Sequence, residues 1–145
     1  MCRQMWAVIL LILCMSQVRA SDQVFAGLYE VDVSLELPHV LDAATRKTTT
    51  LCLNEDEGTA FGLAVLSDNN PLANCPVSAI LRQGNAVSFD IICPGVNAAQ
   101  GHAAYRLAQT NFEGRIEMKM GGKNMTMTEV QSGRRIADCH PAQQH

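Results

Sequence analysis

Alternation of apolar and polar side chains along residues 28–37 is the feature that most restricts the fold of this chain. Every second residue of the segment is apolar, and the residues between are polar: Tyr29, Val31, Val33, Leu35 and Leu37, alternating with Glu30, Asp32, Ser34 and Glu36. A period of two places alternate side chains on opposite faces of a β-strand, so the segment predicts a strand with one buried face. Pro38 ends it, and after a loop the β-branched residues 46–53 predict its antiparallel partner.

The segment between Cys75 and Cys93 predicts a hairpin that turns at Gln83-Gly84-Asn85. One register pairs apolar residues throughout: Leu81 with Val87, Ala79 with Phe89, and Val77 with Ile91. A shift by one residue would oppose Val87 with Arg82 and Ile91 with Ser78, which a half-buried sheet resists. The favoured register also sets Cys75 opposite Cys93.

Two further hairpins are predicted toward the carboxyl end. A turn at Thr110-Asn111 pairs Leu107 with Gly114, Tyr105 with Ile116 and Ala103 with Met118, and turns Glu113, Arg115, Glu117 and Lys119 outward. A turn at Gly121-Gly122-Lys123-Asn124 opposes Met120 with Met125 and Met118 with Met127. The chain is therefore expected to be all-β and mainly antiparallel, a meander of about seven strands that forms a curved sheet or a small barrel.

Residues 54–74 predict one short helix or irregular loop between the second and third strands. Asn54 is the expected N-cap, and the carboxylates of Glu55, Asp56 and Glu57 suit the first turn. These carboxylates lack the spacing of a calcium loop. The buried side of the helix would carry Phe61, Leu63, Ala64 and Leu66, and the helix would lie across one end of the sheet.

The first 20 residues have the form of a cleavable export signal. Arg3 precedes an apolar stretch at residues 5–15, and Val18-Arg19-Ala20 offers the small side chains that a signal peptidase reads. Eleven apolar residues are too few for a membrane-spanning helix, which takes roughly 20. Lipid attachment at Cys14 is disfavoured because Leu13 is not small. We therefore expect cleavage after Ala20, no stable membrane anchor, and a single β domain at 21–145 with its core at about 26–139.

Charge and cysteine content point to an exported protein that does not bind nucleic acid. The whole chain has 11 basic and 14 acidic residues and a net charge of −3, which becomes −5 when Arg3 and Arg19 leave with the signal. No basic cluster remains to displace counterions from nucleic acid. The signal also removes two of the six cysteines, Cys2 and Cys14.

The remaining four cysteines, Cys52, Cys75, Cys93 and Cys139, predict two disulfides in an oxidising compartment. No pair has the two-residue spacing of a zinc knuckle or a redox-active dithiol. The hairpin register favours Cys75 with Cys93, which leaves Cys52 to Cys139. The alternative joins Cys52 to Cys75 and Cys93 to Cys139.

Four methionines share one face of the last hairpin: Met118, Met120, Met125 and Met127. Thioether sulfur is a soft ligand that suits Cu(I), so the group is a candidate metal site. Methionine also fills irregular gaps in cores, and burial alone explains the alternation. The four histidines outside the signal, His39, His102, His140 and His145, have no spacing typical of a metal pair, and Asn124-Met125-Thr126 is a glycosylation sequon only in a eukaryotic source.

No catalytic constellation is evident, and no cofactor is expected. The chain lacks a nucleophile in a strand-to-helix turn, a Ser-x-x-Lys pair and a glycine-rich phosphate loop. Its acidic residues occupy the outward positions of strands, where solvation explains them.

Several segments together make the chain similar to a bacterial family of exported Gram-negative proteins, domain of unknown function 3617. The resemblance rests on Gly27-Leu28-Tyr29-Glu30, Cys52-Leu53, the lone Cys75 and Cys93, the methionine hairpin, and Arg135-Ile136-Ala137-Asp138-Cys139. The family tends to have tryptophan where Tyr29 stands and glycine where Ala137 stands, and Leu37-Pro38-His39-Val40-Leu41 replaces its Met/Pro-rich segment. The resemblance implies periplasmic residence and the four-cysteine framework, and it supplies no activity and no catalytic residue.

The function expected from the sequence is a non-enzymatic binding or interaction module. Its partner would be another protein of the cell envelope or a small apolar ligand. Two alternatives stand beside it: a carrier that encloses a small apolar ligand in a closed barrel, and Cu(I) binding by the methionine hairpin.

Overall fold

The computed structural model describes residues 26–38, 40–122 and 125–140, with residues 40–45 described by their backbone only. This part of the chain forms seven strands and one short 3-10 helix. In chain order they are β1 (Gly27–Leu37), β2 (Val40–Leu53), η1 (Glu57–Gly62), β3 (Val77–Gln83), β4 (Ala86–Ile92), β5 (Gln100–Leu107), β6 (Asn111–Met120) and β7 (Met125–Ala137). The second strand begins at Val40, so it is longer than the predicted 46–53, and the predicted loop after Pro38 is short.

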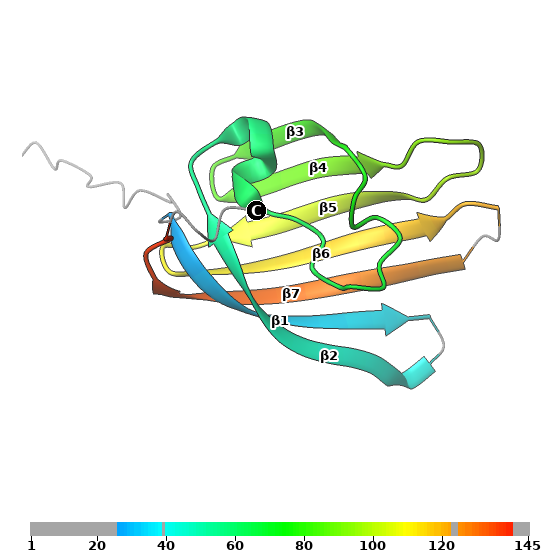
Figure 1. Ribbon diagram of the computed structural model, residues 1–145, viewed down its shortest axis with the longest axis horizontal. Helices are drawn as coiled ribbons and strands as arrows, with labels where there is room; N and C mark the ends of the chain where they lie inside the picture. Colours follow the sequence, from blue (N-terminus) through cyan, green and yellow to red (C-terminus); the bar gives the residue numbers. More distant parts are fainter. Residues whose placement is uncertain (1–25, 39, 123–124, 141–145) are drawn as a thin grey trace, which may run out of the picture.

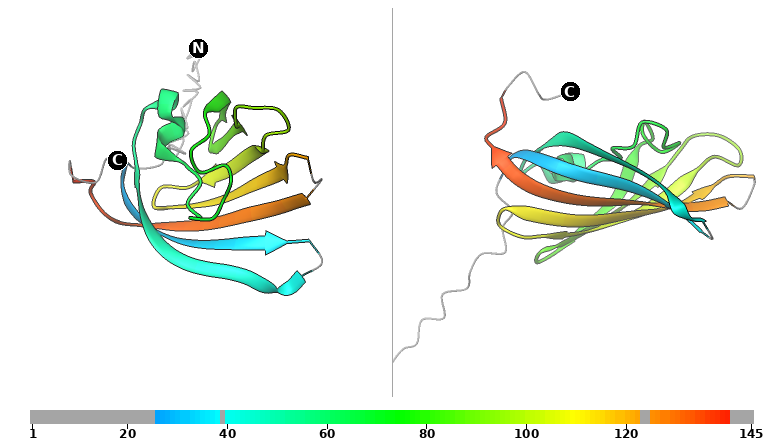
Figure 2. Two further views of the ribbon diagram at one scale, coloured as in Figure 1. Left: turned by 45° about the vertical axis from the view of Figure 1, so that its right-hand side comes forward. Right: turned by 90° about the horizontal axis from the view of Figure 1, so that it is seen from below.

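The strands form one open antiparallel sheet in the order β2-β1-β7-β6-β5-β4-β3 (Figure 1). Strands β3 to β7 follow one another as a meander, and β7 then pairs with β1. The all-β prediction is confirmed in its curved-sheet form. The sheet does not close into a barrel, because β2 and β3 are its two edges. Figure 2 shows it curving around the segment that connects them.

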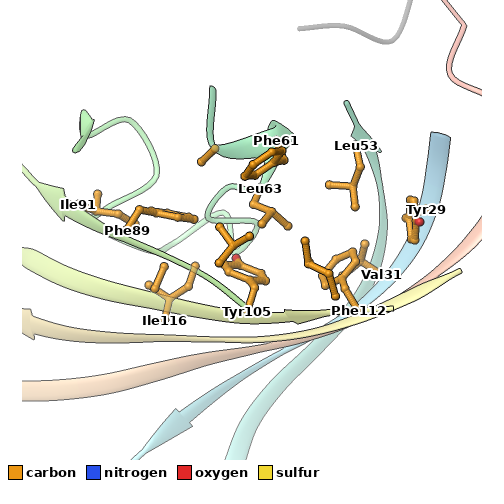
Figure 3. Packing of buried hydrophobic residues seen from close by; sticks show 14 of the residues in the cluster. Tyr29, Val31, Leu53, Phe61, Leu63, Phe89, Ile91, Tyr105, Phe112 and Ile116 are labelled. Atoms are coloured by element: carbon orange, nitrogen blue, oxygen red, sulfur yellow. The ribbon is translucent and has the colours of Figure 1, made fainter. Parts of the chain in front are cut away.

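One face of the sheet carries the hydrophobic core. We call the face with Val31, Phe89, Tyr105, Phe112 and Ile116 the inner face, and the opposite one the outer face (Figure 3). The aromatic rings form a continuous row in which Tyr105 lies 5.8 Å from Phe89 and 5.9 Å from Phe112, centroid to centroid. The alternation in β1 is explained by this face, since Tyr29, Val31 and Val33 are all buried.

The register of β3 and β4 agrees with the prediction at one end only. Val77 lies opposite Ile91 as predicted, but a bulge shifts the pairing beyond Ser78. The bulge contains Ala79, whose φ of +52° lies in the left-handed region. The predicted pairs Leu81 with Val87 and Ala79 with Phe89 are therefore wrong. Arg82 lies opposite Val87, and Leu81 turns outward with 52% of its surface exposed.

The pairing of β5 with β6 differs from the prediction by two residues. The observed partners are Leu107 with Phe112, Tyr105 with Gly114, and Ala103 with Ile116. A Cβ on Gly114 would lie 2.2 Å from Tyr105 Cε1, so the ring of Tyr105 packs over the space that glycine leaves. A shift of two keeps every side chain on its face, and the predicted outward residues are exposed: Glu113, Arg115, Glu117 and Lys119. The predicted pairs of the methionine hairpin are confirmed.

The predicted helix after β2 is a short 3-10 segment with a kink inside it. Its cap is Asp56, whose carboxylate accepts a hydrogen bond from Gly58 N at 2.9 Å, so the prediction of Asn54 as cap is wrong. No regular helix forms, because Ala60, Phe61 and Gly62 within the segment all have positive φ. Phe61 and Leu63 are buried as predicted, whereas Ala64 is exposed and Leu66 is only partly buried. The segment contacts both edge strands.

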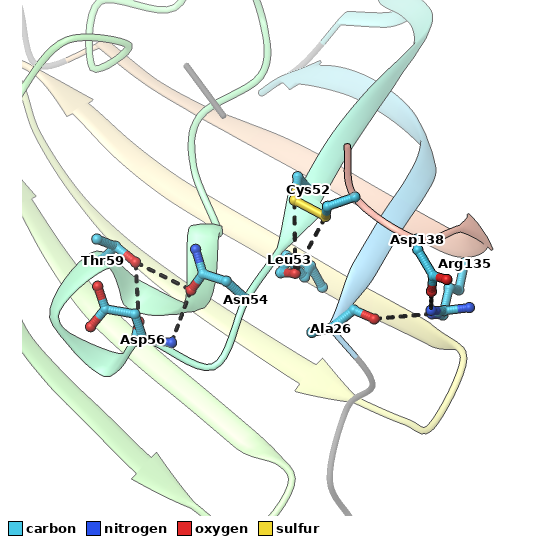
Figure 4. The surroundings of a disulfide bond; sticks show 9 residues. Ala26, Cys52, Leu53, Asn54, Asp56, Thr59, Arg135 and Asp138 are labelled. Atoms are coloured by element: carbon cyan, nitrogen blue, oxygen red, sulfur yellow. Dashed lines mark hydrogen bonds and ion pairs between the residues drawn. A yellow bond between two sulfur atoms is a disulfide. The ribbon is translucent and has the colours of Figure 1, made fainter. Parts of the chain in front are cut away.

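The two disulfides are those that the hairpin register favoured, Cys52 to Cys139 and Cys75 to Cys93. The first joins the end of β2 to the residues after β7 (Figure 4). Beside it, Arg135 Nε donates a hydrogen bond to the Ala26 carbonyl at 3.2 Å, and the same guanidinium pairs with Asp138. Two disulfides indicate an oxidising compartment.

Candidate binding surfaces

Most charged side chains of the strands lie on the outer face, and several pair across it. Arg134 lies 2.9 Å from Glu30, and His102 Nδ1 lies 2.7 Å from Asp90 Oδ1. Such exposed pairs contribute little to stability. Within the described ranges no three His, Cys, Asp or Glu residues are grouped as metal ligands.

The remaining predicted candidates are dispersed. His140 follows Cys139 and is exposed, on a different part of the fold from His102. His39, His145 and Asn124 of the sequon lie outside the described residues.

The inner face is covered by residues 63–76, which we call the strap. Leu63 and Leu72 of the strap are buried within the core cluster, and Val65 and Leu66 pack against it. The strap occupies the position in which a barrel would hold a ligand. The hypothesis of a carrier with a closed barrel is therefore wrong, because the sheet is open and strap side chains fill the inner face.

A buried carboxylate fastens the strap to β7. Glu129 is fully buried, and its oxygens accept hydrogen bonds from Leu66 N at 2.8 Å, Ser67 N at 3.3 Å and Asn70 Nδ2 at 2.7 Å. Gln131 Nε2 donates to Glu129 Oε1 at 2.7 Å and to the Ala64 carbonyl at 2.8 Å. The strap is thus held by polar contacts as well as by its apolar side chains.

Sequence reasoning missed Glu129 and Gln131. The signal was present, because the predicted pairing of Met118 with Met127 places every second residue of β7 on the inner face, and that series continues through residues 129 and 131.

The same network reaches Tyr105, whose hydroxyl donates to Gln131 Oε1 at 3.1 Å. Burial raises the pKa of Tyr105 far above its ordinary value, the nearby charge of Glu129 raises it further, and the hydrogen bond to Gln131 partly opposes the rise. Burial also raises the pKa of Tyr29, against the smaller effect of Arg135. Both hydroxyls therefore stay protonated at neutral pH.

The outer face is uncovered, and its centre is hollowed. The hollow has a volume of about 520 Å³. Its outward-facing lining consists mostly of short side chains, together with one amide and three ionic groups: Leu81, Ala86, Ser88, Ala104, Val130 and Ser132, with Gln83, Arg106, Glu113 and Arg115.

A single row of register partners accounts for much of the hollow. Leu81 lies opposite Ser88, Ser88 opposite Ala104, Ala104 opposite Arg115, and Arg115 opposite Val130, across five strands. The sequence signal for this surface is that a few short apolar residues stand among the charged residues at the outward positions of the strands. Solvation explains the charged residues but not these apolar ones.

The four methionines lie on the inner face as predicted, at the end of the β6–β7 hairpin. Their burial differs. Met118 belongs to the core with 3% of its surface exposed, and Met127 packs against the core. Met125 is 49% exposed, and Met120 is only partly buried. The quartet therefore runs from the core to solvent.

The sequence model of a family described as a protein of unknown function, DUF3617, matches residues 24–139. The chain belongs to the DUF3617 family. No curated protein and no solved structure matches it. In the described part of this DUF3617 protein, no helix has the length and hydropathy needed to cross a membrane.

The terminal segments that carried the resemblance to DUF3617 meet at one end of the sheet. Leu28 lies opposite Ala137, and Tyr29 opposite Arg135. A Cβ on Gly27 would lie 2.5 Å from Arg135 Nε, so the arginine side chain lies against bare glycine backbone. Together with the Cys52–Cys139 disulfide, these contacts hold β1, the first strand, against β7, the last strand.

Proposed function

We propose that this domain is a non-enzymatic binding module of the bacterial periplasm, and that it holds a small amphipathic anion in the hollow of its outer face. The observation that carries the proposal is the hollow itself. It lies at the centre of the sheet face that the strap leaves open, and its volume of about 520 Å³ falls within the roughly 300–1,000 Å³ of small-molecule sites.

The inner face supports the proposal by elimination. It holds the hydrophobic core and the strap, so opening it to a ligand would mean separating Phe61, Leu63 and Leu72 from the sheet. A ligand on the outer face needs no such change.

The lining of the hollow suits an apolar chain. Leu81, Ala86, Ala104 and Val130 supply apolar surface, and half of the Leu81 surface is exposed. Burying apolar area contributes about 25 cal/mol per Å², so a short hydrocarbon segment gains from lying along this row.

The charges of the hollow suit an anionic head group. Two guanidinium groups, Arg106 and Arg115, and one carboxylate, Glu113, line it. Arg115 pairs with Glu36 at 3.1 Å. Arg106 lies opposite Glu113 in the register of β5 and β6. Among the described residues, however, no carboxylate lies within ion-pair distance of its guanidinium, so this group can receive a carboxylate or phosphate oxygen.

The chemistry of the hollow supports binding rather than turnover. Its hydroxyls, those of Ser88 and Ser132, have no histidine among the other lining residues to act as a base. Periplasmic residence is supported by the export signal expected from the sequence and by the two disulfides.

Binding of decanoate to the oxidised protein, followed by calorimetry, tests the proposal. We expect saturable binding that strengthens from hexanoate to decanoate and is weaker for the neutral detergent octyl glucoside. Arg106→Gln should weaken decanoate binding about tenfold, equivalent to about 1.4 kcal/mol. The matched control is Arg134→Gln, because Arg134 lies on the same face outside the hollow.

Two results would overturn the proposal. One is the absence of saturable binding for every chain length. The other is equal weakening by Arg106→Gln and Arg134→Gln, which would indicate general attraction to a charged face. Hydrolysis of a decanoate ester by the wild-type protein that is lost in Ser88→Ala would show that the domain is an enzyme and not a binding module.

A further inference from the structure

All methionines that follow residue 15 gather at one place in the fold. Three of the seven lie within the first 15 residues, and the other four are Met118, Met120, Met125 and Met127. Direct partners across an antiparallel pair have Cβ atoms about 4.5–5.5 Å apart. The pairs Met118 with Met127 and Met120 with Met125 are neighbours on the same face, so the four flexible thioether side chains are grouped at one end of the hairpin.

Packing explains only the inner pair. Met118 is buried in the core, and Met127 packs against it. Met120 and Met125 lie outside the core cluster, and Met125 exposes 49% of its surface. Filling the core requires no apolar side chain at these two positions. The outer pair is the part of the group that a ligand role explains and packing does not.

A buried negative charge lies next to the methionines. Glu129 follows Met127 by two residues on the same face of β7, and it is fully buried. Its hydrogen-bond donors are neutral amides, and none of the described Lys, Arg or His side chains forms an ion pair with it. A cation held by the methionines would be attracted by this charge, because the interior between them has a low dielectric constant.

The donor chemistry selects the cation. Thioethers are neutral and soft, and they favour Cu(I) over Zn²⁺, Ca²⁺ or Mg²⁺. Cys52, Cys75, Cys93 and Cys139 are held in disulfides and cannot compete as thiolates. From the paired methionines, their gradient from core to solvent and the adjacent carboxylate, we propose that Met118, Met120, Met125 and Met127 bind one Cu(I) ion. The site is separate from the outer-face hollow and does not depend on it.

The test is an anaerobic titration of the oxidised protein with the acetonitrile complex of Cu(I), against a chromogenic Cu(I) chelator. The protein is purified from a bacterial periplasm, and its N-terminus is read by mass spectrometry. Cys2 and Cys14 are replaced by serine where they remain. We expect saturation at one equivalent, with no displacement by excess Zn²⁺.

Variants decide whether the methionines are the ligands. Met120→Leu with Met125→Leu changes only the pair outside the core, so the fold is kept, and affinity should fall at least about tenfold. Leu81→Met adds a single exposed thioether on the outer face and should add no second equivalent. An unchanged Cu(I) affinity in the double leucine variant would contradict the proposed site. Loss of Cu(I) binding on the single substitution His140→Ala would also contradict it. Failure of the wild-type protein to retain Cu(I) against the chelator would do the same.

Discussion

The guanidinium carbon of Arg82 lies 5.0 Å from the ring centroid of Phe61. This cation–π contact joins edge strand β3 to the 3-10 helix. It exists because the bulge at Ala79 turns Arg82, and not Leu81, toward the inner face.

The bulge therefore predicts which of these two neighbours matters for stability. Arg82→Ala should lower the free energy of unfolding by about 1 kcal/mol through the lost ring contact. Leu81→Ala should change it by less than about 0.5 kcal/mol, because Leu81 is exposed. Urea unfolding of the oxidised protein measures both changes. A larger loss of stability in Leu81→Ala than in Arg82→Ala would indicate that Leu81 faces the core, as in the register without the bulge.

Removing the carboxylate of Glu129 should release the strap. In Glu129→Ala, the amides of Leu66, Ser67 and Asn70 lose their acceptor, and unsatisfied buried groups cost about 1–3 kcal/mol each. We expect a loss of at least about 3 kcal/mol and faster hydrogen exchange confined to strap amides. Glu113→Gln, on the exposed face, is the control. A loss below about 1 kcal/mol would show that apolar packing alone holds the strap.

The two tyrosines predict how stability responds to alkali. Burial raises the pKa of both above the ordinary 10.0, so the folded protein holds these protons more tightly than the unfolded chain. Stability is then unaffected by them below about pH 10 and falls as the pH rises further.

Ultraviolet absorbance of the phenolate group measures this directly. In the folded protein Tyr105 should not ionise near pH 10 but only together with alkaline unfolding, and Tyr29 should ionise at a higher pH than in the unfolded chain. In concentrated guanidinium chloride both should titrate near 10. Reversible ionisation of both tyrosines near pH 10 in the folded protein would be incompatible with the burial of Tyr105.

The two disulfides should contribute unequally. Their sequence separations are 87 residues for Cys52–Cys139 and 18 for Cys75–Cys93. Loop-closure entropy then gives stabilisation of about 4.6 and 3.2 kcal/mol respectively. Paired Cys→Ala variants, compared by denaturant unfolding, should rank in this order. Non-reducing peptide mapping that joins Cys52 to Cys75 would contradict both pairings.

Local periodicity in the sequence was sufficient for most of the sheet. Alternation predicted which residues of β1, β5 and β6 face inward, and one register predicted the Cys75–Cys93 disulfide. It failed at Ala79, because a bulge adds one residue without a glycine or proline to mark it. It also failed at the β5–β6 turn, since a shift of two residues preserves the pattern of faces.

The polar centre of the inner face depends on tertiary contacts. Glu129 is buried because its partners Leu66 and Asn70 lie about 60 residues earlier in the chain, on the strap. No local sequence pattern predicts the contact between Glu129 and the strap. The outer hollow arises similarly, from short side chains on separate strands that become neighbours only when the sheet forms.

We have proposed that the outer face binds a ligand while the inner face stays closed. Amide chemical shifts of the oxidised protein, followed by NMR during titration with decanoate, test it most directly. We expect shifts centred on Leu81, Ser88, Ala104 and Val130, with Leu63 and Leu72 of the strap unchanged. Shifts centred on the strap and the core, with none in the hollow, would contradict it.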